Sequence, residues 1–270
     1  MKGSCLNLSG TQVKRSGRTI LDIDNLRISS GEFIGIIGAN GAGKTTLLKL
    51  CCGLIKPSRG TIEFDNTDLA AMSIWSKSNL RKRIGYIPQA TEYNSELPFT
   101  LREVVAMGRT SVKPLLSRLN RDDYEHIDYW IDKLGLTSRR NQTFRTLSGG
   151  EQQKALLARA MSQTPAVLML DEPCSNLDFN WKYQITDIID ELYQSATGGH
   201  ITVLMVSHET GLLPANCNRI ILLREGRILA DDVPEKVLKS DAIEEAYQCR
   251  IETVEIDGRK YTISKRYSNS

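Results

Sequence analysis

The sequence contains no long hydrophobic run: none of its segments approaches the ~18 consecutive apolar residues that a membrane-spanning helix requires. The first residues, Met1-Lys2-Gly3-Ser4-Cys5, contain no apolar segment either, so we expect no secretory signal. The formal net charge is only +3 and no block of Lys and Arg stands out, which argues against a nucleic-acid partner. Any role at a membrane must therefore come through another protein.

The cysteine pattern of a metal site is also missing. The six cysteines form no C-x-x-C pair and no cluster with the three histidines, so we expect no zinc-type site. We interpret the cysteines as reduced thiols of a cytoplasmic protein. They are Cys5, Cys51, Cys52, Cys174, Cys217 and Cys249.

The composition is that of an ordinary globular protein, with 40% hydrophobic and 25% charged residues, and the chain is long enough to bury a large core. As far as Ile87 the pattern is β-rich and indicates a single helix, which ends near Cys52 and Gly53. The expected strands in this part are 6–13, 20–26, 32–37, 61–64 and 83–87.

Helical spacing dominates the middle of the chain, over 101–107, 122–134 and 150–161, with Gly or Pro between the segments. An α/β pattern then resumes, with strands over 166–170 and 201–206, a helix over 181–194, and hairpins about Gly226 and Gly258. We predict one domain over 1–270. It consists of a core (1–92 and 164–246), an inserted helical lobe (93–163) and a β-hairpin tail (247–270).

The most informative segment is a glycine-rich loop between an apolar strand and a helix. Its G-x-x-x-x-G-K-T pattern is typical of a phosphate-binding loop, although a glycine-rich turn before an ordinary helix is the simpler alternative. Glycines let backbone N–H groups surround a phosphate, and the following helix adds its positive dipole end. Lys44 would reach the β- and γ-phosphates, and the Thr45 hydroxyl would hold Mg²⁺. The loop consists of Gly38, Ala39, Asn40, Gly41, Ala42, Gly43, Lys44, Thr45 and Thr46.

Two acidic residues, Asp171 and Glu172, follow the all-apolar strand over 166–170. Ligands bind at the carboxyl ends of the strands in a parallel α/β sheet. Asp171 is suited to support Mg²⁺ beside Thr45, and Glu172 could polarise a water molecule at the γ-phosphate. Two surface acids at the end of a strand are the simpler alternative.

A second glycine-rich segment, Leu147-Ser148-Gly149-Gly150-Glu151, precedes the helix over 150–161. Ser148 and Glu151 have the spacing of a capping box. The glycine pair exposes backbone N–H groups at the start of a helix, which makes a second anion site.

These three motifs, in this order, resemble the ATP-binding cassette (ABC) transporter ATPases over nearly the whole chain. The resemblance implies an α/β P-loop NTPase fold with a mixed sheet core, an N-terminal antiparallel β subdomain and an inserted helical subdomain. It implies that Ser148, Gly149 and Gly150 form the signature motif. That motif would meet the γ-phosphate of ATP bound to a second copy, in a head-to-tail homodimer holding two ATP.

The resemblance also implies roles for three further residues. Gln89 matches the Q-loop, which touches Mg²⁺ and the attacking water. Asp178 matches the D-loop, which crosses the dimer interface, and His208 matches the switch histidine, which contacts the γ-phosphate. The resemblance assigns no role to His126 and His200, which we interpret as structural.

The sequence departs from the family pattern where an aromatic ring usually stacks on adenine. Arg15 stands near that position, and a guanidinium can stack on a base, although a solvated surface arginine is the alternative. Cys174 and Asn176 also replace the usual residues beside the acidic pair without removing a catalytic group.

The predicted activity is hydrolysis of ATP to ADP and phosphate, with Mg²⁺ as cofactor and Lys44, Gln89, Glu172 and His208 as catalytic residues. The segment 97–109 resembles importers of metal chelates (ferric siderophores, haem or cobalamin), and zinc and manganese importers have a similar segment. The expected partners are integral-membrane permease subunits and, indirectly, a substrate-binding protein. The expected location is the cytoplasmic face of the membrane. A soluble ABC ATPase without a permease, and a nucleotide-binding regulator without hydrolysis, are the alternatives.

Overall fold

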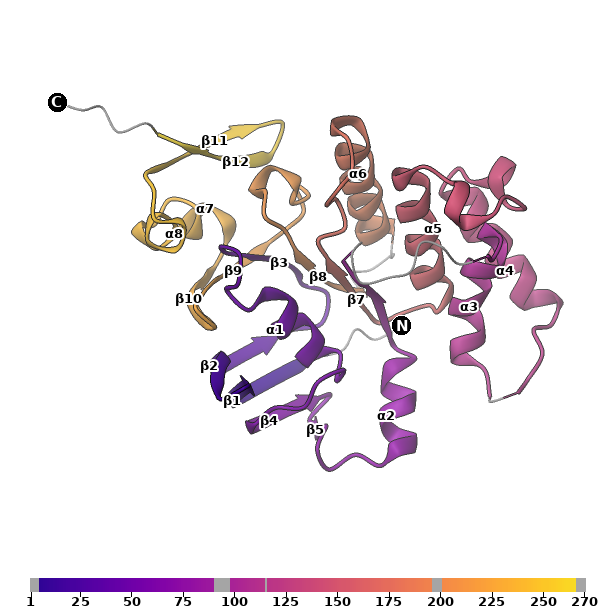
Figure 1. The fold of residues 1–270 in the computed structure, drawn as a ribbon, viewed down its shortest axis with the longest axis horizontal. Helices are drawn as coiled ribbons and strands as arrows, with labels where there is room; N and C mark the ends of the chain where they lie inside the picture. The colour runs from indigo at the N-terminus through magenta and orange to yellow at the C-terminus, as the bar shows by residue number, and fades with distance from the viewer. Residues whose placement is uncertain (1–4, 90–97, 115, 196–200, 266–270) are drawn as a thin grey trace.

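The computed structural model describes residues 5–89, 98–114, 116–195 and 201–265. The smaller of its two main sheets is antiparallel, in the order β2-β1-β4-β5 (Figure 1). One side of β1 is buried at alternating positions, which is the pattern of a sheet with one face on the core. The strands are β1 (Leu6–Arg15), β2 (Arg18–Ile28), β4 (Arg59–Phe64) and β5 (Thr67–Asp68).

The larger sheet is mixed, in the order β10-β9-β3-β8-β7-β6, and only the β9–β10 pair is antiparallel. Every residue of β3, β7 and β8 is buried, as expected for strands covered on both faces. The strands are β3 (Phe33–Ile37), β6 (Ile84–Ile87), β7 (Val167–Asp171), β8 (Thr202–Val206), β9 (Arg219–Arg224) and β10 (Arg227–Asp232).

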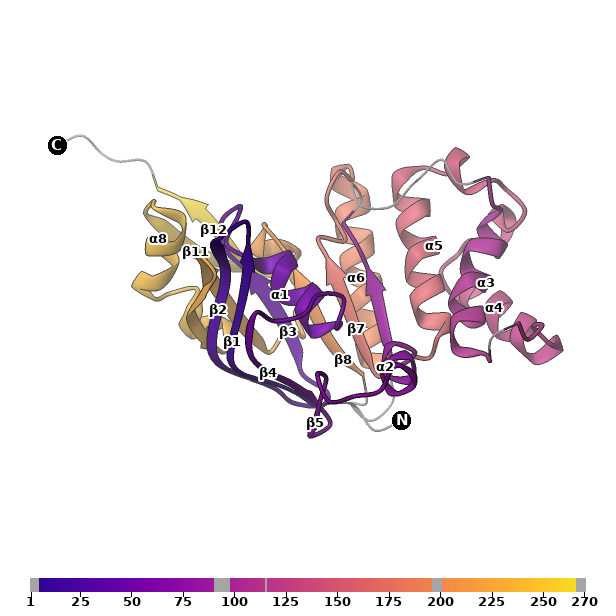
Figure 2. The ribbon, with the colours of Figure 1, turned by 60° about the horizontal axis from the view of Figure 1, so that its bottom comes forward.

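The two faces of the larger sheet pack against different helices (Figure 2). Helix α1 (Lys44–Cys51) lies between the two sheets, where Leu47 and Leu48 join one hydrophobic cluster with Ile34. Helix α6 (Phe179–Ser195) covers the opposite face, where Ile185 packs in a second cluster with Phe33. Neighbouring residues of β3 therefore serve two separate cores.

Helices α3 (Leu101–Val112), α4 (Arg121–Lys133) and α5 (Gly149–Ser162) pack together at one end of the molecule (Figures 1 and 2). Each begins at a capping box, formed by Thr100, Asn120 and Ser148 respectively. Helix α3 continues through Gly108 to Val112, beyond the predicted end of the helix at Met107. A Cβ at Gly108 would lie 2.0 Å from the Arg159 carbonyl oxygen, so glycine here permits close packing of α3 on α5.

Three helices were not predicted: α2 (Ile74–Arg81), α7 (Pro234–Val237) and α8 (Asp241–Tyr247). Only Leu80 of α2 is buried, so the helix has no apolar stripe that periodicity could detect. Its start is marked by Ser73, whose side chain accepts a hydrogen bond from the Ser76 N–H. Short 3₁₀ turns, η2 (Thr137–Arg139), η3 (Phe144–Thr146) and η4 (Thr210–Leu212), complete the helical segments.

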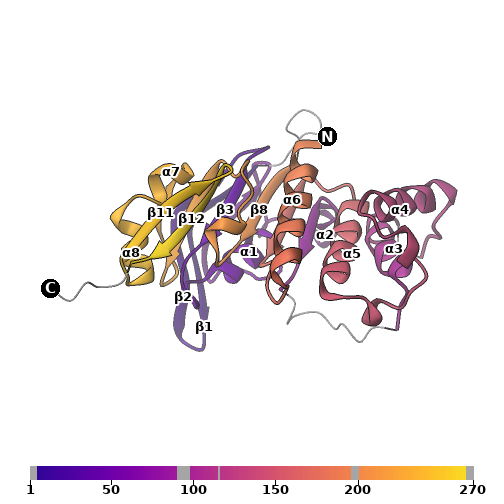
Figure 3. The same ribbon diagram turned by 90° about the horizontal axis from the view of Figure 1, so that it is seen from above.

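The predicted C-terminal hairpin is formed by β11 (Ile251–Ile256) and β12 (Arg259–Ser264). It lies on the same side of the molecule as α6 (Figure 3). The Thr262 N–H donates to the Thr210 hydroxyl at 2.9 Å, which ties the hairpin to η4.

This architecture confirms the predicted fold class: a mixed α/β core, an N-terminal antiparallel sheet and a group of helices between β6 and β7. The predicted start of the helical lobe at 93, part of the segment 97–109, His200 and the end of the tail lie outside the described residues.

Candidate nucleotide-binding site

The glycine-rich loop joins β3 to α1 and is shaped by three glycines with positive φ: Gly38, Gly41 and Gly43. Gly38 has φ 145° and Gly43 has φ 101°, conformations that residues with a Cβ rarely adopt. A Cβ on Gly38 would also lie 2.2 Å from the Leu223 carbonyl oxygen, so the loop passes too close to β9 for any other residue.

Lys44 folds back across this loop. Its ammonium donates hydrogen bonds to the carbonyl oxygens of Gly38 at 2.8 Å and Ala39 at 3.0 Å. Burial lowers the pKa of Lys44, whereas the nearby carboxylates of Glu172 and Asp171 act in the opposite direction. The side chain thus places a cation over the loop, beside two acids.

Thr45 and Asp171 are 126 positions apart in the sequence, and the Thr45 hydroxyl donates to the Asp171 carboxylate at 3.0 Å. Asp171 is completely buried at the end of β7, and β8 lies between β7 and β3 in the sheet. Hydroxyl and carboxylate oxygens are ligands that Mg²⁺ prefers. The donor set therefore fits the predicted support of Mg²⁺. No group of three or more His, Cys, Asp or Glu that could hold a metal by itself occurs in the described part of the chain.

Glu172 is held in a left-handed backbone conformation, with φ 52°. Such a conformation costs a non-glycine residue about 1–3 kcal/mol and persists where the surrounding structure imposes it. Here the Ser175 hydroxyl and N–H both donate to the Glu172 carbonyl oxygen, at 2.9 and 3.0 Å. At this turn the carboxylate contacts Gln89 and His208.

The Glu172 carboxylate has partners from two other strand ends. Gln89, after β6, donates from Nε2 to Glu172 Oε2 at 2.8 Å. His208, after β8, contacts Glu172 Oε1 through Nε2. Since β6, β7 and β8 are parallel neighbours, their carboxyl ends bring these three residues together.

These residues line one cleft of about 780 Å³. This volume is within the range of ~300–1,000 Å³ that is typical of ligand pockets. The cleft is lined by all four residues predicted for catalysis and by most of the glycine-rich loop. Its lining residues are Ile20, Asn40, Gly41, Gly43, Lys44, Thr45, Thr46, Gln89, Glu172, Ser175, Asn176 and His208.

The signature segment and Asp178 do not line this cleft of the same chain. The Ser148–Glu151 capping box is present, with Ser148 N–H donating to the Glu151 carboxylate at 2.9 Å. A Cβ on Gly150 would lie 2.0 Å from the Trp181 ring, so glycine lets α5 start against α6. Asp178 accepts a hydrogen bond from the Trp181 N–H at 2.9 Å, at the start of α6. Their action on a second copy stays a prediction.

Arg15 is exposed at the β1–β2 turn, paired with Arg18 across the hairpin, and is absent from the cleft lining. From this hairpin the residue that reaches the cleft is Ile20, which the sequence did not single out. Contact of Arg15 with a base therefore stays a prediction.

Sequence reasoning also missed Tyr247, at the end of α8. Its hydroxyl accepts a hydrogen bond from the Gly38 N–H at 3.1 Å, so the C-terminal region contacts the first residue of the glycine-rich loop. No motif marks Tyr247, because the contact depends on how α8 packs beside β9.

Comparison with known proteins gives these features a family. The family model described as "ABC transporter" matches residues 21–175, which is more than half of the chain. The chain belongs to the ABC transporter family. The matched part of this ABC domain includes the glycine-rich loop, Gln89, the signature segment and the Asp171–Glu172 pair.

Curated relatives extend the similarity beyond that region. The ABC domain is 34% identical over 247 residues to the cobalamin import ATP-binding protein BtuD of Halobacterium salinarum, covering 91% of the chain and 59% of that relative. It is 35% identical over 239 residues to the hemin import ATP-binding protein HmuV of Rhodopseudomonas palustris, covering 86% of the chain and 83% of that relative. The chain thus spans less than two thirds of the first relative.

Solved structures share the fold. An ABC transporter assigned to the metal-chelate type, solved in an inward-facing conformation, aligns with a TM-score of 0.80 and 22% identity, covering 98% of this chain and 99% of the other. A dimeric ATP-binding cassette bound to ADP and phosphate aligns with a TM-score of 0.72 and 25% identity, covering 84% and 98%. Among the described residues, no helix combines the length and apolar character needed to cross a membrane.

Proposed function

We propose that this ABC domain is the ATP-hydrolysing subunit of a transporter that imports a metal chelate. The observation that carries the proposal is the single cleft of about 780 Å³ in which Lys44 and Thr45 face Glu172, Gln89 and His208. The catalysed reaction is ATP + H₂O to ADP + phosphate.

Binding of ATP rests on the glycine-rich loop. Its N–H groups and the N-terminus of α1 favour the negative charge of the phosphates. Lys44 now donates to two loop carbonyl oxygens, so its ammonium already lies at the loop and can transfer those bonds to phosphate oxygens. Thr45, Asp171 and Gln89 would hold Mg²⁺, which neutralises charge on the phosphates when bound.

Hydrolysis rests on Glu172. Its carboxylate lies at the cleft and can accept a proton from a water molecule placed in line with the γ-phosphate. Gln89 and His208 hold one carboxylate oxygen each, which orients the group before the nucleotide arrives. A group positioned in advance needs no reorganisation during the reaction, which lowers the barrier.

We infer that the working unit is a head-to-tail homodimer with two ATP at its interface. Ser148, Gly149 and Gly150 lie outside the cleft of their own chain, so they are available to a nucleotide on a second copy. The capping box fixes the start of α5, where Ser148 and Gly149 are exposed and the positive end of the helix dipole lies. The dimeric cassette with ADP and phosphate supports a dimer as the working unit.

Transport requires permease subunits, on whose cytoplasmic side we place this domain, and a substrate-binding protein. Relatives named as cobalamin and hemin import ATP-binding proteins support a metal chelate as the cargo. A zinc or manganese importer, or an ABC ATPase that works without a permease, would share the same cleft. Purification from membranes separates transport from the permease-free alternative, because recovery without a permease contradicts transport.

The test of hydrolysis is the substitution Glu172→Gln, which removes the proton acceptor but keeps the shape. We expect ATP turnover to fall about 100-fold or more, since general base catalysis contributes ~10²–10⁴-fold. ATP affinity, measured by calorimetry, should stay nearly unchanged. Glu209→Gln is the matched control, because Glu209 is an exposed nearby acid that pairs with Lys182. Unchanged turnover in Glu172→Gln would refute the assignment.

A further inference from the structure

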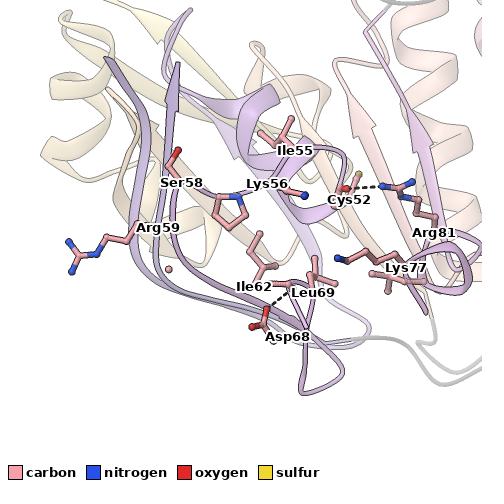
Figure 4. A pocket seen from close by; sticks show the side chains of 15 residues that line it. Cys52, Ile55, Lys56, Ser58, Arg59, Ile62, Asp68, Leu69, Lys77 and Arg81 are labelled. Atoms are coloured by element: carbon pink, nitrogen blue, oxygen red, sulfur yellow. Dashed lines mark hydrogen bonds between the residues drawn. The ribbon is translucent and has the colours of Figure 1, made fainter. Parts of the chain in front are cut away.

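A second cavity, of about 320 Å³, lies at the opposite end of α1 from the glycine-rich loop (Figure 4). It is bounded by the residues that follow α1, by β4 and β5, and by α2. We call it the α1–α2 pocket. It shares no lining residue with the nucleotide cleft, so the proposed ATPase function does not account for it.

The floor of the α1–α2 pocket is apolar. Ile62, Leu69 and Leu80 line it, and each is no more than 9% exposed because its other side packs in the core beneath the smaller sheet. Cys52 also lines it and is 3% exposed. Burial raises the pKa of the Cys52 thiol well above its ordinary value, so this thiol is neutral and counts as part of the apolar floor.

The rim of the pocket is cationic. Figure 4 shows the side-chain ends of Lys56, Lys77 and Arg81 directed towards the same space above the floor. The Arg81 guanidinium donates one hydrogen bond to the Gly53 carbonyl oxygen at 3.2 Å, which leaves other N–H groups that can donate to a ligand. Within the described part of the chain, no carboxylate oxygen lies within 4 Å of the ammonium of Lys56 or Lys77.

Few acidic side chains oppose these cations in the lining of the pocket. Asp68 is the single acidic residue among those that line it, and its Oδ1 accepts a hydrogen bond from the Ala70 N–H at 2.8 Å. Cations that face an apolar cavity without anionic partners create a positive potential where a ligand would bind. An anionic group there would gain charge-assisted hydrogen bonds, while an apolar group would leave water for the floor.

We propose that the α1–α2 pocket binds a small amphipathic anion, with an apolar body on the Ile62–Leu69–Leu80 floor and an anionic head between Lys56, Lys77 and Arg81. A volume of about 320 Å³ is at the lower end of the ~300–1,000 Å³ range of ligand sites, so the body is short. The ligand would contact the C-terminal end of α1, the helix that begins at Lys44, and α2, the helix that precedes β6.

The test uses calorimetry on the full chain with three eight-carbon probes: octanoate, octanol and octylamine. Octanoate should bind saturably, and octanol and octylamine at least 10-fold more weakly. Saturating ADP with Mg²⁺ should leave octanoate binding intact, because the two sites are separate. Loss of octanoate binding when ADP is present would place the probe in the nucleotide cleft and overturn the proposal.

The matched variants are Lys77→Ala, in the middle of α2, and Lys82→Ala, directly after α2, which remove one lysine each. Only Lys77 lines the pocket, so Lys77→Ala should weaken octanoate about 10-fold, equivalent to about 1.4 kcal/mol, and Lys82→Ala should not. Equal effects of the two variants, or octanol binding as tightly as octanoate, would contradict the proposal.

A free anion and the end of a membrane lipid share this chemistry. Vesicles of phosphatidylglycerol, added to octanoate titrations, separate the two sources. Displacement of octanoate by the vesicles indicates a lipid, and unaffected octanoate binding indicates a free small molecule. Either result supports the pocket, provided that Lys77→Ala weakens octanoate binding as predicted.

Discussion

The hydrogen bond between Tyr247 and Gly38 makes a sharp prediction about the glycine-rich loop. Tyr247→Phe removes only the hydroxyl that accepts the Gly38 N–H at 3.1 Å. A single hydrogen bond contributes ~1 kcal/mol net, so the thermal midpoint should fall by about 2–4 °C. If the bond holds the loop in its binding shape, the affinity for ATP should also fall, by up to about fivefold.

Tyr193→Phe is the matched control for this prediction. The Tyr193 hydroxyl donates to the Gly31 carbonyl oxygen at 2.7 Å, shortly before β3, whereas the Tyr247 hydroxyl contacts Gly38, directly after β3. Both tyrosines are half-buried. Burial raises the pKa of each, so both hydroxyls are neutral at pH 7. The two variants should therefore lose similar stability.

The assay combines thermal unfolding with calorimetric titration of ATP on each variant. We expect both variants to unfold at a lower temperature, and only Tyr247→Phe to bind ATP more weakly. Normal ATP affinity in Tyr247→Phe would refute the reasoning, because the bond would then stabilise the fold without shaping the loop. Equal loss of affinity in Tyr193→Phe would refute it too, since the effect would then follow from stability alone.

Two further predictions concern other close contacts. Gly150→Ala places a Cβ 2.0 Å from the Trp181 ring, so we expect a loss of about 1–3 kcal/mol in urea unfolding and little residual ATPase activity; wild-type stability would contradict the contact. Asp123 is 1% exposed. Although burial raises its pKa, hydrogen bonds from Lys113, the Asn120 N–H and Arg109 hold it well below its ordinary value. A carboxyl group whose pKa is lower in the folded than in the unfolded state stabilises the fold at pH values above its unfolded pKa of ~3.9. Asp123→Asn should therefore lower the free energy of unfolding at pH 5–7, and this loss should shrink as the pH falls below about 4. Unfolding midpoints measured from pH 3 to 7 check this, and a cost that does not change with pH would oppose it.

The sequence by itself determined the local parts of this protein. The glycines of the segment 38–46 stand at the loop positions with positive φ, which favour glycine, and the apolar run before Asp171 favours a strand buried on both faces. Capping residues such as Ser148 mark helix starts because they bond to groups three residues away. These are short-range interactions, so their signals lie within a few neighbouring residues.

Tertiary structure alone decided which distant residues meet. The Gln89–Glu172–His208 contacts depend on the strand order β8-β7-β6, which no single segment encodes. Helix α2 carries no apolar stripe, Tyr247 matches no motif, and the α1–α2 pocket arises where two sheet strands and two helix ends leave space between them. Such features follow from packing between elements that are far apart in the chain, and the residues involved carry no local signal of it.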